Sequence, residues 1–133
     1  MAPDAPGRLP AAVRLLLVSD DGSFRGVTSL LLERNGYAVR TTSHGAPLRL
    51  AEVAREYRAD VVLIDEPPTR ARAARTVAAL ELLYPRGRPL LLCEEGGTLS
   101  LVSVPHVGRS SPIAELKAAI ERCYAGERPH AAH

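Results

Sequence analysis

Pairs of carboxylates directly follow three apolar segments of this chain, at Asp20 and Asp21, Asp65 and Glu66, and Glu94 and Glu95. If these segments are neighbouring parallel strands, their carboxyl ends meet at one edge of a sheet and the like charges repel. A positive partner is then needed, and two candidates are Mg²⁺, which takes carboxylate oxygens, and the guanidinium of Arg109. We expect Asp20 and Asp65 to carry the function of this edge. The neighbouring Asp21, Glu66 and Glu95 are expected to be turn residues or helix caps in water.

Asp65 is the residue around which the chain is organised. The four apolar residues before it, 61–64, are too few for a helix and are typical of a strand buried on both faces of a parallel sheet. Pro67 and Pro68 prevent the strand from continuing. A carboxylate at the carboxyl end of a buried strand occupies the place where open α/β sheets bind ligands.

Strands and helices are predicted to alternate along the chain. The strands are expected at 13–18, 37–42, 60–65, 89–93 and 104–107. One helix is expected where Phe24, Val27, Leu30 and Leu31 recur at helical spacing. Others are expected at 46–58, at 69–84 and from Ser111 to Gly126. In the last of these, Ser111 is the expected cap and Pro112 the first helical residue. Leu48 and Ala74 are placed on the inward faces of the second and third helices. Because the segment 98–103 is too short for a normal helix, we expect an α/β doubly wound three-layer sandwich with a five-stranded parallel sheet and a short or missing fourth helix.

The composition limits the function classes. The 133 residues suffice for one domain, predicted at 13–126, with a flexible lead at 1–12 and a flexible tail at 127–133. A formal net charge of +2 is too small to favour direct nucleic-acid binding or a membrane surface, and no apolar run reaches transmembrane length. Cys93 and Cys123 lack the spacing of a disulfide framework or a zinc site, so a reduced, cytoplasmic location is expected.

The order of these segments resembles the receiver domain of two-component response regulators, which has a flavodoxin-like fold typified by the bacterial chemotaxis regulator. The resemblance covers about 13–126. Residues 15–21, Leu-Leu-Leu-Val-Ser-Asp-Asp, are similar to the opening strand and acidic cluster, and 59–65, Ala-Asp-Val-Val-Leu-Ile-Asp, to the phosphoacceptor strand. Residues 31–39 are similar to the end of the first helix and the second strand, and 110–121 to the last helix. The order and spacing of these motifs together carry the resemblance.

The resemblance implies a role for each matching position. Asp65 would accept a phosphoryl group from a sensor histidine kinase. Asp20 would bind Mg²⁺ directly, with Asp65 and the backbone carbonyl of Pro67 as further ligands. The metal would screen the carboxylate from the incoming phosphate during in-line transfer.

Several positions depart from the family pattern. Ser19 stands where the family usually has a second acidic residue, and His106 where it has the switch aromatic. Glu94, or Cys93 if the register slips by one, stands in place of the switch Ser or Thr. Arg109 stands in place of the switch lysine, and the only lysine, Lys117, lies too far along the last helix to replace it.

Two interpretations of the site therefore remain open. In one, Asp65 is phosphorylated with a weakened Mg²⁺ site. In the other, Arg109 forms a permanent salt bridge to Asp65 or Glu94, and the chain is a degenerate, phosphorylation-independent interaction module. Both predict a non-enzymatic signalling protein. Its expected partners are, first, a histidine kinase or another signalling protein and, second, an output domain or partner protein. A homodimer is a further option.

Two further alternatives stay open at this point. One is a small flavodoxin-like cofactor-binding protein or enzyme, with Cys93 as its candidate nucleophile. No glycine-rich loop follows the first predicted strand to support it. The other is a receiver cut from a longer regulator, with the segment from Gly126 to His133 as the start of a linker.

Overall fold

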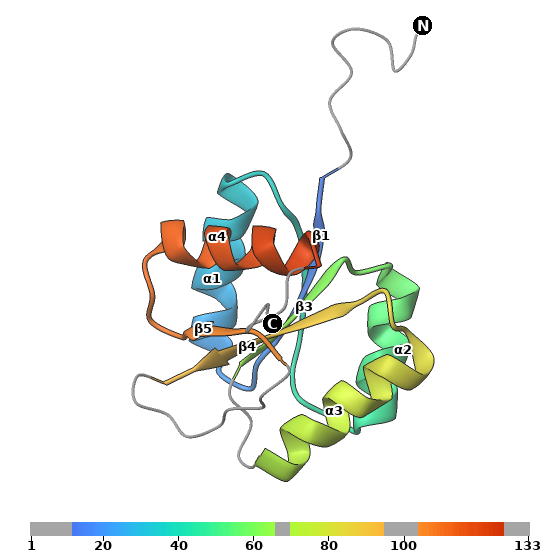
Figure 1. Ribbon diagram of the computed structural model, residues 1–133. Coiled ribbons are helices and arrows are strands. Elements are labelled where there is room, and N and C mark those ends of the chain that lie inside the picture. Colours follow the sequence, from blue (N-terminus) through green and yellow to red (C-terminus); the bar gives the residue numbers. More distant parts are fainter. Residues whose placement is uncertain (1–11, 66–69, 95–103, 127–133) are drawn as a thin grey trace, which may run out of the picture.

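The computed structural model describes residues 12–65, 70–94 and 104–126, and it contains five strands and four helices in alternating order (Figure 1). The elements are β1 (Arg14–Val18), α1 (Gly22–Arg34), β2 (Ala38–Thr42), α2 (Pro47–Tyr57), β3 (Val61–Asp65), α3 (Arg70–Leu83), β4 (Arg88–Cys93), β5 (His106–Gly108) and α4 (Ile113–Tyr124). Pro67, most of the predicted lead, the predicted tail and the segment 98–103 lie outside the described residues. The domain boundaries stay a prediction.

The five strands form one parallel sheet in the order β2-β1-β3-β4-β5. The chain runs outward from β1 to β2 and then returns to the other side of β1 with β3. The carboxyl ends of β1 and β3 therefore lie at the point where the strand order reverses, which in open α/β sheets is where a crevice forms. Val18 and Ile64 are paired across these two strands, so Ser19 and Asp65 emerge side by side.

Helices cover both faces of the sheet, which confirms the predicted three-layer α/β sandwich (Figure 1). On one face, Leu16, Val18 and Ile64 pack with residues of α2 and α3. On the other face, Leu15, Leu17 and Leu63 pack with Leu32 of α1 and with Leu116 and Ile120 of α4. Because successive side chains of a strand point to opposite faces, the uninterrupted apolar run of β3 fills both layers and all five of its residues are buried.

The faces that the helices bury differ in part from those predicted. In α1 the buried residues are Thr28 and Leu32, whereas Val27 is 61% exposed. In α2 Leu48 is exposed, and in α3 Ala73 is buried in place of Ala74. The apolar spacing marks these helices correctly but not their rotation about their axes, which depends on the packing of each helix against the sheet.

The helix ends also show one correction. The side chain of Asp21 caps α1, since its Oδ1 accepts a hydrogen bond from the backbone N of Phe24 at 3.1 Å. The predicted cap Ser111 is not used, because Pro112 is the cap residue of α4 and no side chain caps that helix. Between β4 and β5, the described residues Glu94, Val104 and Pro105 form no helix.

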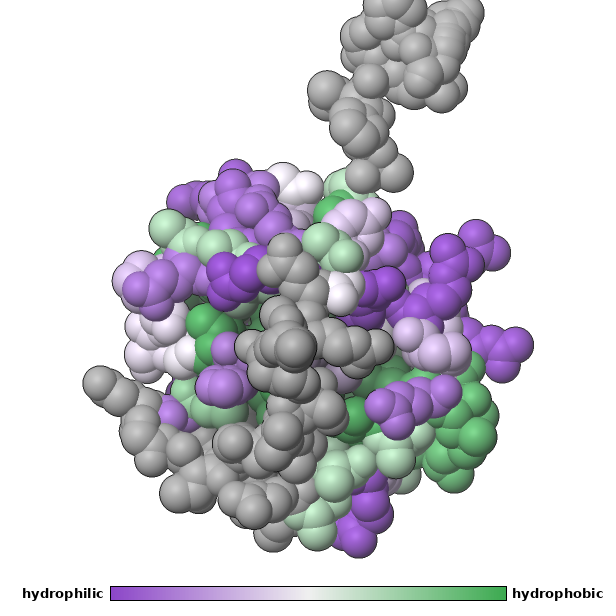
Figure 2. Space-filling view, in the orientation of Figure 1, coloured by the Kyte–Doolittle hydropathy of each residue, from purple (hydrophilic) through white to green (hydrophobic). Residues whose placement is uncertain are grey.

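The surface carries an apolar area over α2 and α3, visible in green in Figure 2. Leu48 and Leu82 are exposed there, and they line a shallow groove with Ala78 and Ala79. None of the helices within the described part of the chain is long and apolar enough to cross a bilayer.

Candidate functional site

Asp65 is the last residue of β3 and is almost completely buried, with 6% of its surface exposed. It lies beside Ser19, which follows β1 and is fully buried. The Oγ of Ser19 donates a hydrogen bond of 2.7 Å to Oδ2 of Asp65. The same Oγ accepts from the backbone N of Asp21 at 3.1 Å, so the hydroxyl joins the turn after β1 to the Asp65 carboxylate.

Arg109 closes the other side of the Asp65 carboxylate. It follows β5, and its backbone N donates to the carbonyl O of Cys93 at 2.6 Å, which ties the turn to the end of β4. Its side-chain Nε donates to Oδ1 of Asp65 at 2.6 Å. Since Ser19 occupies Oδ2, both oxygens of Asp65 are hydrogen-bonded within the protein.

The rest of the Arg109 guanidinium reaches two further carboxylates and a ring. Its Nη2 donates to Oδ2 of Asp21 at 2.9 Å, and its Nη1 lies 3.9 Å from Oε2 of Glu94. The guanidinium carbon stacks 4.1 Å from the centre of the Phe24 ring. One cation thus compensates carboxylates from the ends of β1, β3 and β4, which the sequence had left to either Arg109 or a metal.

The proton equilibria agree with this arrangement. The hydrogen bond to Asp65 raises the pKa of Arg109 above its ordinary value, with a smaller contribution from Asp21. The backbone N of Phe24 lowers the pKa of the exposed Asp21 carboxyl, and Arg109 lowers it further. Arg109 is therefore a cation and Asp21 an anion at neutral pH.

Asp20 does not join this cluster among the described residues. It is exposed, and its Oδ1 accepts a hydrogen bond of 2.8 Å from the backbone N of His44 in the loop after β2. His44 in turn places Nε2 2.9 Å from the backbone carbonyl O of Asp65. Because a carbonyl oxygen only accepts hydrogen bonds, Nε2 carries the proton.

His44 and Ser19 were not predicted to lie together against Asp65. In the sequence, Ser19 stands out only as a departure from the family pattern, and no motif marks His44. The signal that could have identified His44 is the doubly wound topology, because the observed strand order puts the carboxyl ends of β2 and β3 on either side of β1.

The predicted Mg²⁺ ligands do not converge on one point within the described residues. Asp20 faces His44, Asp65 is engaged on both oxygens, and Pro67 lies outside the described residues. In the part of the chain that the structure describes, no group of three His, Cys, Asp or Glu side chains is placed to hold a metal ion. The donor types suit Mg²⁺, but as arranged they do not fit it, because the Arg109 guanidinium stands against the carboxylate that the metal would need.

Solved structures similar to this chain include many receiver domains. A two-component response regulator of the LuxR family from Aurantimonas sp. is 26% identical over 88% of each chain, with a TM-score of 0.64. The receiver domain of a sensor histidine kinase from Pseudomonas aeruginosa, described with a magnesium ion coordinated in its active site cleft, is 22% identical, with a TM-score of 0.64 over 87% of this chain and 100% of that one. A putative pilus assembly-related protein from Burkholderia pseudomallei is 20% identical, with a TM-score of 0.69 over 89% of this chain and 93% of that one.

Comparison of the sequence alone finds no relative among family models or curated proteins. The likeness therefore rests on the three-dimensional arrangement, and the alternative of a flavodoxin-like enzyme or cofactor-binding protein finds no support in it.

Proposed function

Because this chain has the fold of the receiver domain of two-component response regulators, we propose that it is an atypical receiver whose acidic site is held in one state by an internal ion pair. One observation carries the proposal. The Arg109 guanidinium donates to Asp65 at 2.6 Å and reaches Asp21 and Glu94 as well, so it supplies the positive charge that the acidic edge requires.

The contacts of Asp65 argue against efficient phosphoryl transfer to it. An in-line attack needs a carboxylate oxygen that points freely at the phosphorus. Oδ1 accepts from Arg109 and Oδ2 from Ser19, so each oxygen has a lone pair occupied and is a weaker, less freely oriented nucleophile. Mg²⁺ would have to displace the same guanidinium, and we therefore propose that its binding is weak.

The residues around Asp65 take roles that differ from those of the family pattern. Glu94 stands where a hydroxyl would bond to a phosphoryl oxygen, and its carboxylate contributes to the field around Arg109 instead. Arg109 acts as a wide fork that contacts several carboxylates at once, which the compact ammonium of a lysine cannot do in the same geometry.

The proposed activity is protein-protein signalling without catalysis by this domain. A sensor histidine kinase or another cytoplasmic signalling protein would bind the surface around the acidic edge. An output domain or partner protein would respond to that binding and not to a phosphoryl group. The location of this exchange is proposed to be the cytoplasm.

The experiment compares the natural chain with a variant in which the family residues are restored. Both proteins are incubated with acetyl phosphate and Mg²⁺, and the intact mass is measured. We expect no phosphoryl adduct on the natural chain and an adduct on the double variant Ser19→Asp with Arg109→Lys. Lysine replaces the wide guanidinium fork by a compact ammonium, and Ser19→Asp adds a carboxylate ligand for Mg²⁺. The matched control adds Asp65→Asn to the double variant and should abolish the adduct.

An adduct on the natural chain that disappears with Asp65→Asn alone would refute the proposal and assign a phosphorylatable receiver. If the natural chain takes no adduct and Mg²⁺ leaves its melting temperature unchanged, the ion-paired state is supported.

A further inference from the structure

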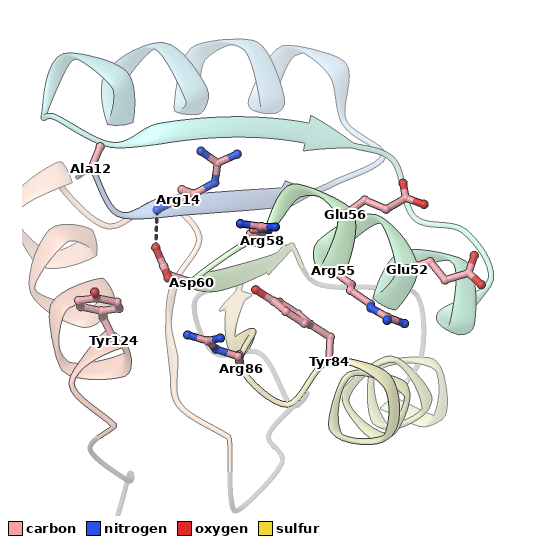
Figure 3. Close-up of a pocket in the computed structure, with 10 residues that line it drawn as sticks. All are labelled: Ala12, Arg14, Glu52, Arg55, Glu56, Arg58, Asp60, Tyr84, Arg86 and Tyr124. Carbon is pink, nitrogen blue, oxygen red and sulfur yellow. Dashed lines mark hydrogen bonds between the residues drawn. The ribbon is translucent and has the colours of Figure 1, made fainter.

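A large pocket opens at the end of the sheet opposite Asp65, where the strands begin (Figure 3). Its volume is about 1110 Å³. Four arginines line it, and we call it the arginine pocket after Arg14, Arg55, Arg58 and Arg86. They come from β1, from the end of α2 and from the turn before β4, so the fold gathers them from segments far apart in the sequence.

Several polar groups of the arginine pocket already form contacts within the protein. The Nε of Arg14 donates to the carbonyl O of Tyr57 at 2.8 Å, and its guanidinium stacks on the Tyr57 ring at 4.3 Å. Asp60 accepts a hydrogen bond from the backbone N of Arg14 at 2.8 Å (Figure 3). Glu52 pairs with Arg49 outside the pocket at 3.3 Å. Glu52 is thus paired with a cation, whereas Asp60 accepts from a neutral backbone group and keeps its charge in the pocket.

Three guanidiniums remain for a ligand. Within the described part of the chain, Arg55, Arg58 and Arg86 form no side-chain ion pair or hydrogen bond, and all three are exposed. Glu56 is the one lining carboxylate there without such a partner. All told, the lining carries four guanidiniums against three carboxylates, and this positive balance favours an anion.

Arg58 occupies an unusual backbone position. It ends α2 with φ of +60°, in the left-handed region where glycine or asparagine is the usual residue. A side chain is costly at this position. A contact between the Arg58 guanidinium and a ligand would explain why an arginine occupies this backbone position.

Two tyrosines supply flat apolar surfaces to the same pocket. The hydroxyl of Tyr84 donates to the carbonyl O of Ala59 at 2.9 Å, which fixes that ring against the wall. Tyr124, from α4, is 50% exposed and lies on the side of Asp60 away from Tyr84 (Figure 3). Tyrosine rings of this kind stack on planar rings, including nucleobases.

We propose that the arginine pocket binds a small phosphate-bearing ligand with a planar ring, of the nucleotide class. Guanidiniums such as those of Arg58 and Arg86 bind phosphate oxygens in a bidentate manner, and a tyrosine face accepts the ring. The volume exceeds that of most small-molecule sites, so a nucleotide fits. This inference is independent of the proposed function, because the pocket lies at the other end of the sheet from Asp65.

The experiment is a calorimetric titration of the full chain with ATP and, separately, with GTP and tripolyphosphate. Three variants are compared: Arg58→Gly, Arg86→Ala and Tyr124→Ala. Arg75→Ala is the matched control, since Arg75 is an exposed helical arginine that does not line the arginine pocket. Arg58→Gly is informative because glycine suits the backbone at this position, so the variant should melt at no lower temperature than the natural chain.

We expect at least one nucleotide to bind, with an affinity that falls about tenfold or more in Arg58→Gly and in Arg86→Ala, because each removes a charged hydrogen bond. Arg75→Ala should leave the affinity unchanged. Tyr124→Ala should weaken the nucleotide but not tripolyphosphate. The proposal is overturned if neither nucleotide binds, if the arginine variants bind as well as the natural chain, if Arg75→Ala is equally impaired, or if tripolyphosphate binds as tightly as the nucleotides.

Discussion

The substitution Arg109→Ala tests the ion pair at the centre of the acidic edge. It removes the donor to Oδ1 of Asp65 and leaves a nearly buried carboxylate whose Oδ2 is still bonded by Ser19. It also removes the hydrogen bond to Asp21 and the stacking on Phe24. We expect a folded protein of clearly lower stability.

The size of the effect follows from the burial of the two partners. The side chains of Arg109 and Asp65 are 21% and 8% exposed, so the pair is shielded from water on the Asp65 side. Two unit charges about 4 Å apart attract by about 4 kcal/mol at an effective dielectric constant of about 20. Desolvation of both groups offsets part of this attraction. We expect Arg109→Ala to reduce the free energy of unfolding by about 3 kcal/mol, which corresponds to a fall in Tm of about 10 °C for a domain of this size.

The measurement is a double-mutant cycle of Arg109→Ala, Asp65→Asn and the double variant, each followed by urea denaturation. The two residues are in direct contact, so their effects should not add. A coupling free energy of about 2 kcal/mol is expected. Arg75→Ala provides the control for loss of an exposed arginine and should change stability by less than about 0.5 kcal/mol.

A coupling below about 0.5 kcal/mol, the value typical of an exposed ion pair, would refute this reasoning. It would mean that Asp65 and Arg109 are stabilised separately. The proposed single state of the site would then lose its physical basis.

Three further predictions concern other parts of the molecule. Arg58→Gly should raise the free energy of unfolding in urea by about 0.5–1 kcal/mol, because glycine relieves the left-handed backbone at the end of α2; a less stable variant would contradict this. The pKa of Asp21 is lowered in the folded state, so its contribution to stability is present above about pH 4 and lost as the pH falls further. The acid unfolding curve of Asp21→Ala should accordingly be flatter than that of the natural chain, and identical curves would count against the contacts described. Burial raises the pKa of the Cys123 thiol to about 11. When native protein is treated with iodoacetamide at about pH 8, peptide mass analysis should therefore find Cys123 unmodified. Modification of Cys123 before unfolding would contradict its burial.

The sequence alone determined the elements and their order. Apolar runs such as 61–64, bounded by turn residues and prolines, are recorded in neighbouring residues and need no distant contact to be recognised. Alternation of these runs with helical spacing is enough to predict a parallel sheet with helices on both faces, and the structure confirms that architecture. The placement of Asp65 at the edge of the sheet follows in the same way.

The arrangement of the charges at both ends of the sheet depends on tertiary contacts that no local pattern encodes. The sequence offered Mg²⁺ or Arg109 as the partner of Asp65, and the choice depends on a contact between residues 44 positions apart. Packing also determines three other features. Asp20 accepts a hydrogen bond from His44, Ser19 donates one to Asp65, and α1 is rotated so that Val27 is exposed. The arginine pocket is the clearest case, because its guanidiniums come from three separate segments and meet only when the sheet has formed. Residues that act at a distance along the chain leave no local pattern, so their association is visible only after the backbone has brought them together.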